Sequence, residues 1–383
     1  MTQSNWSVPE TEVLRTISAR LGADESTVLA TVVDVEGNAY RRPGAKMLLL
    51  PDGEGIGSIT AGCLEDDLLR MGRTVRAEGR PRLETYDLTE GEEDVWGLGV
   101  GCNGVIEVLL EPLGESYRPA VEAVADGRDI ASVTVLGGDV AELNRGDRAY
   151  FRPGANDLEE VSGTYPEWLF EQLVGAAEEL ARRGRAETLE LEGPGGRVRL
   201  FVDGLAAPTE LYVFGSGHDV GPVTELAALN DFQVTVVGFR GGVDLGDRFP
   251  SAARTVTTSP GALRESLELD DRSHAVVMTH NFVDDRLTVD ELLRTPVPYV
   301  GVMGPRDRFE RMLAEFEAEG RSFADSELAR IYTPVGLDLG GGSPYQIAHS
   351  IVGEVLAVSN GREPRHLKTR EGPIHDRLDI DAE

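Results

Sequence analysis

The chain has 383 residues, a formal net charge of −30 and only two cysteines. This length accommodates two domains, each with its own core. The acidic balance argues against nucleic-acid binding, because no basic surplus is available to neutralise phosphates. No apolar run approaches a membrane span, and the N-terminus lacks the basic start and apolar stretch of a secretory signal. We therefore expect a cytoplasmic protein with reduced thiols and no nucleic-acid or membrane partner.

The basic residues are strongly biased toward arginine. Of 37 basic residues only Lys46 and Lys368 are lysines, and the acids are scattered over the whole length. One hypothesis is a halophilic host, whose salt-rich cytoplasm screens the self-repulsion of an acidic surface. The alternative is an ordinary acidic bacterial protein.

The first half combines helices with strands that form hairpins. In chain order the patterns predict a helix at 11–21, strands at 28–35, 46–50 and 105–110, a helix at 166–183, and a final strand pair, LELEG and RVRLFVDG. The strands at 28–35 and 46–50 are expected to pair with each other. We expect an α+β domain with a mixed sheet over residues 1–208.

The pattern changes at Ala206-Ala207-Pro208, which marks the expected domain boundary. After it, short apolar strands alternate with helices, which is typical of a parallel, doubly wound sheet. The strands are expected at 211–214, 234–237, 275–278 and 299–303. We expect a Rossmann-like α/β domain over 209–361, followed by a polar tail over 362–383.

The first of these strands runs into a glycine turn and then a helix. Gly215, Gly217 and Gly221 have the spacing G-x-G-x-x-x-G, and glycines in this context let a backbone approach a phosphate. His218 at the helix start and His280 after the third strand are candidate ligand contacts at the same sheet edge. The alternative is a tight strand-to-helix turn that binds no nucleotide.

The second strand of this half ends in Gly238-Phe239-Arg240. Dinucleotide domains usually place an acid there to bind the ribose hydroxyls. Its absence argues against NAD, whereas Arg240 is compatible with the 2′-phosphate of NADP. NADP or another nucleotide therefore stays open as a ligand.

Both cysteines lie in loops of small residues. Cys63 follows Ala61-Gly62 in GSITAGCLEDDL, at the expected start of a helix whose N-terminal field favours a thiolate. Cys102 lies in WGLGVGCNG, directly before a strand. Two thiols without a nearby histidine do not form a zinc site. The alternative for each cysteine is silent packing under its own turn.

One basic patch stands out in the first half. Arg42 and Lys46 belong to RRPGAKM, and their charges suit an anionic ligand such as a phosphate group. The alternative is pairing with the many surface acids.

Taken together, these stretches resemble the xanthine dehydrogenase accessory proteins, the XdhC/CoxI family. The matching segments are ATVVDVEGNAYRRPGAKMLL, GSITAGCLEDDL, VWGLGVGCNGVIEVLLEPL, LYVFGSGHDVGPVTELAALNDFQVTVV, YVGVMGPRDR and TPVGLDLGGGSPYQIAHSI. The chain departs from the family at Asn38-Ala39-Tyr40, where a small-residue and proline run is common, and at Arg240.

The resemblance implies a cofactor chaperone rather than a catalyst. Such a protein binds the molybdenum cofactor (molybdopterin), holds it for sulfuration by a cysteine desulfurase, and inserts it into a molybdenum hydroxylase of the xanthine dehydrogenase type. The resemblance places the cofactor and its molybdenum at Cys63, with Cys102 second. Gly62 would leave room for the cofactor, and Lys46 or Arg42 would hold the pterin phosphate. Homodimers are expected.

Two other functions remain open at this point. An NADP-linked oxidoreductase would use the glycine turn at Gly215 and Gly217. A thiol-based, sulfur-handling enzyme would use Cys63 and Cys102.

Overall fold

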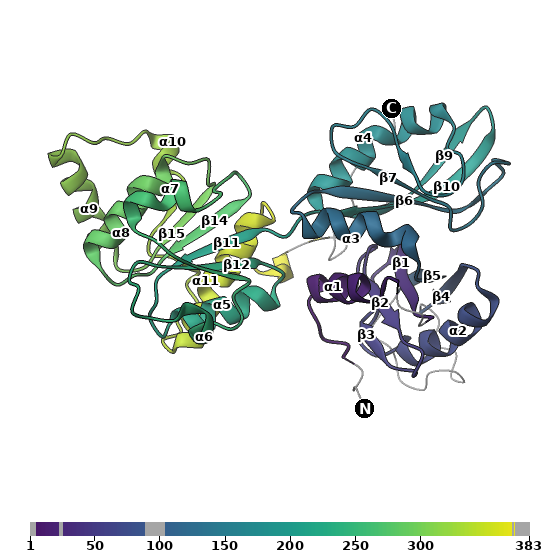
Figure 1. Ribbon diagram of the computed structural model, residues 1–383, viewed down its shortest axis with the longest axis horizontal. Helices are drawn as coiled ribbons and strands as arrows, with labels where there is room; N and C mark the ends of the chain where they lie inside the picture. Colours follow the sequence, from purple (N-terminus) through teal and green to yellow (C-terminus); the bar gives the residue numbers. More distant parts are fainter. Residues whose placement is uncertain (1–4, 23–25, 89–103, 370, 372–383) are drawn as a thin grey trace. The chain divides into compact units, whose positions relative to one another are not determined.

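The computed structural model describes residues 5–22, 26–88, 104–369 and 371. The chain divides between Ala207 and Pro208 into two compact units (Figure 1). Unit 1 holds the residues up to Ala207, and unit 2 spans Pro208–Thr369. Most of the tail expected at 362–383 lies outside the described residues.

Unit 1 is built on two five-stranded sheets. Sheet A has the strand order β3-β2-β1-β5-β4, with β1 Val28–Gly37, β2 Lys46–Leu49, β3 Gly55–Gly57, β4 Arg82–Asp87 and β5 Gly104–Pro112. Sheet B has the order β8-β7-β6-β10-β9, with β6 Ile130–Gly138, β7 Arg148–Phe151, β8 Glu159–Glu160, β9 Ala186–Gly193 and β10 Gly196–Leu205.

All strand pairs in these two sheets are antiparallel. The expected α+β class and the β1–β2 hairpin are confirmed, but two antiparallel sheets replace the single mixed sheet that we expected. Hairpins with short loops, such as β1–β2 and β9–β10, account for part of this pattern, because a parallel pair needs a crossover of a dozen or more residues. Among the described residues of unit 1, parallel pairing occurs in one isolated bridge, between Asn5 and Ile56.

Four helices pack on these sheets: α1 Glu10–Arg20, α2 Glu65–Glu78, α3 Arg118–Ala125 and α4 Glu167–Arg183. The helices α2 and α4 cover the outer faces, whereas α1 and α3 share a buried core with residues of both sheets, such as Leu48 and Tyr150. Leu68 and Val75 of α2 share a core with alternate residues of β1 and β5, on one face of sheet A. The α4 helix packs in the same way on sheet B. Side chains on the remaining faces of the two sheets contact each other.

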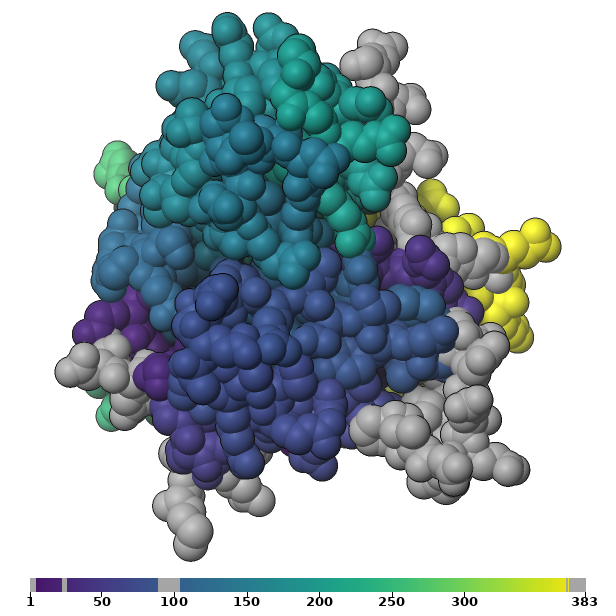
Figure 2. Space-filling view, turned by 90° about the vertical axis from the view of Figure 1, so that its right-hand side faces the viewer, coloured from purple at the N-terminus to yellow at the C-terminus, as the bar shows by residue number. Residues whose placement is uncertain are grey.

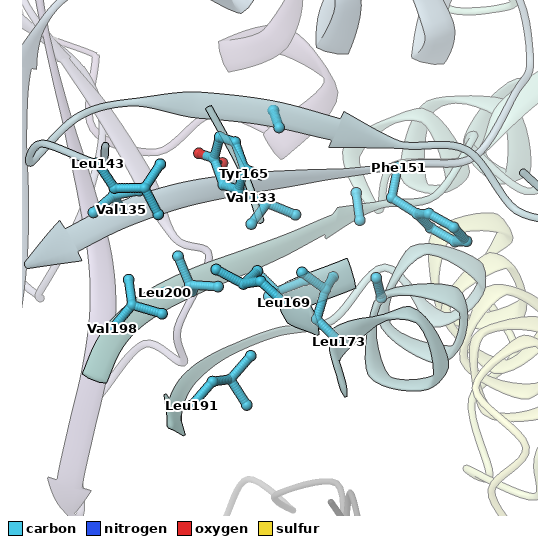
Figure 3. Close-up of a cluster of buried hydrophobic side chains, with 14 of the residues drawn as sticks. Val133, Val135, Leu143, Phe151, Tyr165, Leu169, Leu173, Leu191, Val198 and Leu200 are labelled. Carbon is cyan, nitrogen blue, oxygen red and sulfur yellow. The ribbon is translucent and has the colours of Figure 1, made fainter. Parts of the chain in front are cut away.

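The core between α4 and sheet B shows how the sequence pattern fixes this packing (Figure 3). Val198 and Leu200 of β10 lie two residues apart, so they point to the same face of the strand. Leu169 and Leu173 of α4 lie four residues apart and share one face of the helix. All four side chains are buried, and they meet in one apolar cluster.

The layer between sheets A and B contains buried ion pairs as well as apolar clusters. Two ion pairs cross it: Lys46 Nζ lies 2.8 Å from Asp203 Oδ2, and Arg148 Nη2 lies 2.6 Å from Glu111 Oε1. One apolar cluster is small and consists of Val33, Leu109, Leu136, Ala186 and Phe201. A larger one joins residues of both sheets through α1 and α3. Apolar packing and two buried ion pairs therefore hold the two sheets together.

Unit 2 contains one six-stranded sheet whose pairings are all parallel. The order is β13-β12-β11-β14-β15-β16, with β11 Glu210–Phe214, β12 Gln233–Gly238, β13 Arg254–Thr257, β14 Ser273–Val277, β15 Tyr299–Val302 and β16 Ile331–Tyr332. The expected Rossmann-like architecture is confirmed. The strand order reverses between β11 and β14, which is where ligands bind in such sheets.

Helices lie on both faces of this sheet (Figure 1). They are α5 Val220–Leu229, α6 Leu245–Arg248, α7 Leu263–Ser266, α8 Phe282–Leu293, α9 Arg306–Ala318, α10 Asp325–Leu328 and α11 Pro344–Ser359. One core joins α5 and α11 to the sheet, and the other joins α8 and α9 to the opposite face. Two buried faces explain why these strands are continuous apolar runs.

Candidate functional site

The loop that carries Cys63 is organised around a buried carboxylate. Glu65, the first residue of α2, is fully buried. Its Oε1 accepts a hydrogen bond from Thr60 N at 2.7 Å, and its Oε2 accepts bonds from Thr60 Oγ1 at 2.6 Å and from the amides of Gly62 and Leu64 at 3.1 Å. One side chain thus satisfies the polar groups of a whole turn. The sequence pattern indicates only that Glu65 belongs to the first turn of a helix.

Thr60 fixes the position of Cys63 itself. The Thr60 hydroxyl accepts hydrogen bonds from Cys63 N at 3.0 Å and from Leu64 N at 3.2 Å. The half-buried Cys63 packs against the core under α2. The predicted position at the helix start is confirmed, since α2 begins two residues later. However, Glu65 and Thr60 already bind amides at this end of the helix.

Gly62 creates open space beside Cys63. Its φ angle is +111°, a conformation that residues with side chains rarely adopt, and a Cβ there would meet no atom of the described residues within 4 Å. Backbone geometry, rather than crowding, therefore requires a glycine next to the thiol.

A second acid of α2, Asp67, holds a tyrosine of β4. Asp67 accepts a hydrogen bond from Tyr86 Oη at 2.9 Å and pairs with Arg70. Burial, together with the bond to Asp67, raises the pKa of Tyr86 above its usual range. Tyr86 is therefore a neutral donor at physiological pH. Cys102 lies outside the described residues, so its predicted place beside Cys63 stays a prediction.

The structure assigns Lys46 a different role from the one we expected. Its ammonium group binds Asp203 and donates to Gly44 O at 2.8 Å, and the side chain is only 7% exposed. The cavity that Lys46 lines with Ser58 measures about 20 Å³, room for a single water molecule. The charge of Lys46 is already compensated by the buried carboxylate of Asp203. Lys46 is therefore a structural cation that joins the two sheets, and it is not available to a phosphate. Arg42 is half-buried and, among the described residues, has no hydrogen-bonded or ionic partner for its guanidinium group.

In unit 2 the predicted glycine turn lies at the reversal between β11 and β14. A Cβ on Gly215 would lie 2.6 Å from Met278 O, so the loops after the two strands are in close contact. A Cβ on Gly217 would lie 2.4 Å from Asp219 Oδ1. Gly221 lies in the first turn of α5, where a Cβ would meet nothing.

The two predicted histidines are both at this edge, but in different contacts. His280 Nε2 lies 2.7 Å from Asp219 Oδ2, and His218 Nε2 lies 3.2 Å from Arg248 Nη2. His280 has a φ angle of +59°, in the left-handed region. The sequence analysis missed Asp219, although it lies inside the glycine turn. Its carboxylate lies against the glycines that a pyrophosphate would approach, so it opposes a dinucleotide electrostatically.

A second buried acid holds the loop of His280 in place. Asp285, on α8, accepts hydrogen bonds from Thr279 N at 3.2 Å and Thr279 Oγ1 at 2.5 Å, and it pairs with Arg308. Asn281 caps α8, because its side-chain oxygen accepts hydrogen bonds from the amides of Val283 and Asp284 in the first turn of the helix. His280 is therefore presented between two firmly held neighbours.

Arg240, the alternative contact for a 2′-phosphate, is a highly exposed residue. Its Nη2 lies 3.4 Å from Asp284 Oδ2, and the side chain is 71% exposed. Within the described ranges there is no cluster of three or more metal-binding side chains, and no helix is long and apolar enough to cross a bilayer.

Two family models match the chain. The model of the XdhC and CoxI family matches residues 21–87, which include the loop of Cys63. The model of the XdhC Rossmann domain matches residues 211–355, which include the glycine turn. Together they match more than half of the sequence. The chain belongs to the XdhC and CoxI family.

Similar proteins extend the XdhC likeness to nearly the whole chain. A protein of Bacillus subtilis (strain 168), named as a probable xanthine dehydrogenase subunit, is 28% identical over 344 residues, which cover 89% of this chain and 95% of that protein. A solved structure described as a xanthine dehydrogenase from Bacillus halodurans is 29% identical, with a TM-score of 0.72 over 92% of this chain and 96% of the other. The uncharacterised protein YqeB of Escherichia coli (strain K12) is 28% identical over 43% of this chain and 30% of its own length.

Proposed function

We propose that the protein is an accessory factor that holds the molybdenum cofactor for sulfuration and inserts it into a molybdenum hydroxylase of the xanthine dehydrogenase type. Membership of the XdhC and CoxI family supports this role. So does the likeness to a Bacillus subtilis protein named as a probable xanthine dehydrogenase subunit. The proposed partners are the hydroxylase, a cysteine desulfurase and a second copy of the chain.

The observation that carries the proposal is the rigid presentation of Cys63. Its backbone is fixed by Thr60 and by the buried carboxylate of Glu65, and no atom of the described residues crowds Gly62. Cysteine thiolate is a soft ligand of the kind that suits soft transition metals. The donor chemistry of this loop therefore fits the cofactor, which would bring a molybdenum centre able to accept a sulfur ligand.

The basic residues fit the pterin phosphate less well. Lys46 is committed to Asp203 and drops out of the proposed site. Arg42 remains the proposed contact for the pterin phosphate. Its guanidinium group has no partner among the described residues, and guanidinium groups bind phosphate in a bidentate manner. Cys102 remains the proposed second thiol.

The test is the amount of molybdopterin that copurifies per monomer from a cofactor-producing host, measured by the fluorescence of its oxidised form. Cys63→Ser should lower this amount strongly and Cys102→Ser less, with unchanged melting temperatures. Asp66→Asn, an exposed change in the first turn of α2, is the matched control. Unaltered retention in Cys63→Ser would make the thiol a packing residue and would contradict the proposal.

The NADP-linked alternative is disfavoured by Asp219, whose carboxylate lies against the glycine turn. The thiol-enzyme alternative predicts a reversible Cys63–Cys102 disulfide and no bound pterin. The same purified protein distinguishes these outcomes.

A further inference from the structure

A cleft of about 530 Å³ opens at one end of the layer between sheets A and B in unit 1. This volume lies within the range of small-molecule binding sites. Leu83 of β4 contributes from sheet A, and Leu136 of β6 contributes from sheet B. In the space-filling view of this side of the molecule, the blue residues of sheet A and the teal residues of sheet B adjoin (Figure 2). None of the cleft residues belongs to the Cys63 loop.

An irregularity in β6 shapes this cleft. Arg199 of β10 pairs with Gly137, but the next residue, Leu200, pairs with Val135, so Leu136 is an extra residue in the ladder. Such a bulge leaves its extra residue outside the regular hydrogen bonding. The carbonyl oxygen of Leu136 instead accepts a hydrogen bond from Arg145 Nε at 2.7 Å. The bulge thus anchors a guanidinium group at the cleft.

Two glycines leave room below that guanidinium. A Cβ on Gly137 would lie 3.8 Å from Arg145 Nη2, so the cation lies directly over a residue without a side chain. At Gly138, φ is +148° and a Cβ would lie 2.3 Å from Arg197 O, so only glycine fits there. Apolar packing therefore stops at Leu136, and the space beyond it stays open.

The charges that line the cleft are unequally satisfied. Arg197 Nε lies 3.1 Å from Glu192 Oε2, and Arg199 pairs with two carboxylates of sheet A. Within the part of the chain that the structure describes, Arg145 forms no ion pair. The carboxylate of Glu190 accepts no hydrogen bond there, but it lies opposite Arg199 on the neighbouring strand and interacts with that cation electrostatically. Arg145 is therefore the cation that is available to a ligand, and Glu190 keeps free acceptor oxygens in the same cleft.

We propose that the cleft binds a small organic acid whose apolar body also bears an N–H donor. The anionic group binds the terminal nitrogens of Arg145, the N–H group binds the carboxylate of Glu190, and the body packs on Leu83 and Leu136. Guanidinium groups bind carboxylates and phosphates through the same pair of donors, so either anion is suitable. The site is independent of the proposed role of Cys63.

Isothermal titration of the full chain tests the proposal with three probes. N-acetyl-tryptophan carries a carboxylate, guanosine monophosphate carries a phosphate, and guanosine has the N–H donors without an anion. We expect at least one acid to bind with a dissociation constant below about 1 mM, and guanosine to bind at least tenfold more weakly. The acid that binds more tightly shows whether the site prefers a carboxylate or a phosphate.

Two substitutions locate the binding. Arg145→Ala should weaken it at least tenfold, whereas Arg73→Ala, which removes an exposed arginine of α2, should leave it unchanged. Gly137→Leu should fill the cleft and abolish binding with little change in melting temperature, because the φ angle of Gly137 is ordinary. The proposal fails if neither acid binds below about 1 mM. It also fails if binding survives Arg145→Ala or Gly137→Leu, or if Arg73→Ala weakens it equally.

Discussion

Lys46 Nζ lies 2.8 Å from Asp203 Oδ2, and neither side chain is more than one-tenth exposed. The pair joins β2 of sheet A to β10 of sheet B, across the layer between them. A buried ion pair adds little net stability compared with apolar side chains, but removing one partner leaves the other charge uncompensated. The pair therefore makes the contact between the two sheets sensitive to single substitutions.

Asp203→Ala should lower the free energy of unfolding by about 3–5 kcal/mol, since it strands the ammonium group of Lys46. The double variant Lys46→Met/Asp203→Leu should recover much of this loss. Urea denaturation measures both, and Glu192→Ala, at the exposed pair with Arg197, is the control, with an expected loss under about 1 kcal/mol. A double variant less stable than Asp203→Ala would refute this account.

Glu65→Gln should loosen the loop of Cys63. A glutamine offers one acceptor oxygen in place of two, and its NH2 group then faces either the Thr60 amide or the amides of Gly62 and Leu64, at a cost of about 1–3 kcal/mol. In a Cys102→Ser background, Cys63 should then react faster with Ellman's reagent. Asp66→Asn should change neither quantity. If the reaction rate of Glu65→Gln equals that of the parent, the carboxylate does not control the loop.

Asp219→Asn should make the glycine turn of unit 2 more receptive to phosphates. It removes a negative charge beside Gly217, and we expect the dissociation constant for NADP to fall roughly tenfold at low ionic strength. Calorimetry with this variant and with Asp247→Asn, a nearby exposed control, measures the effect. Equal constants in all three proteins, or no binding by any, would show that the turn is structural.

The acidic surface should make stability depend on salt. With a net charge of −30, self-repulsion opposes the compact state, and salt screens it. The melting temperature should therefore rise steadily between about 0.1 and 3 M potassium chloride, where the Debye length falls well below 10 Å. A melting temperature that is constant over this range would contradict the halophilic hypothesis.

His274, on β14, should make unit 2 less stable in mild acid. Burial lowers the pKa of this imidazole below its usual value, so the unfolded chain binds its proton first as the pH falls. The stabilising contribution is present above about pH 6.5 and is lost below it. Denaturation between pH 8 and 5 should show a smaller loss in His274→Gln than in the parent, whereas the exposed His366→Gln should behave like the parent. Identical profiles for all three would exclude the effect.

The sequence predicted elements better than it predicted what their side chains do. The apolar runs of unit 2 predicted a parallel sheet, because strands buried on both faces leave that pattern. The strands β6 and β7 were missed, although VTVLGG lies within β6. Val133-Thr134-Val135 in fact shows the apolar/polar alternation that marks a strand, with Ser132 and Thr134 on the face toward the other sheet, so the signal was present and was overlooked.

The candidate sites show the same limit. Glycine spacing located the turn at Gly215 and Gly217, because the steric need for glycine is local. The role of Lys46 depended on Asp203, 157 positions away in the chain, and no local pattern reveals such a partner. Glu65 and Asp219 lie inside segments that the sequence singled out. Only burial and contact distances, however, distinguish a structural acid from a solvated one.

The sheets of unit 1 end in ways that discourage pairing with other chains. One margin of each sheet is very short: β3 has three residues and β8 has two. The opposite margins are charged, since β4 has the sequence RLETYD and β9 the sequence AETLELEG. Short or charged edge strands prevent sheets from pairing edge to edge and so protect against aggregation. Two copies of this chain that associate through unit 1 should therefore meet through helices or loops, and never by extending a sheet from one copy into the next.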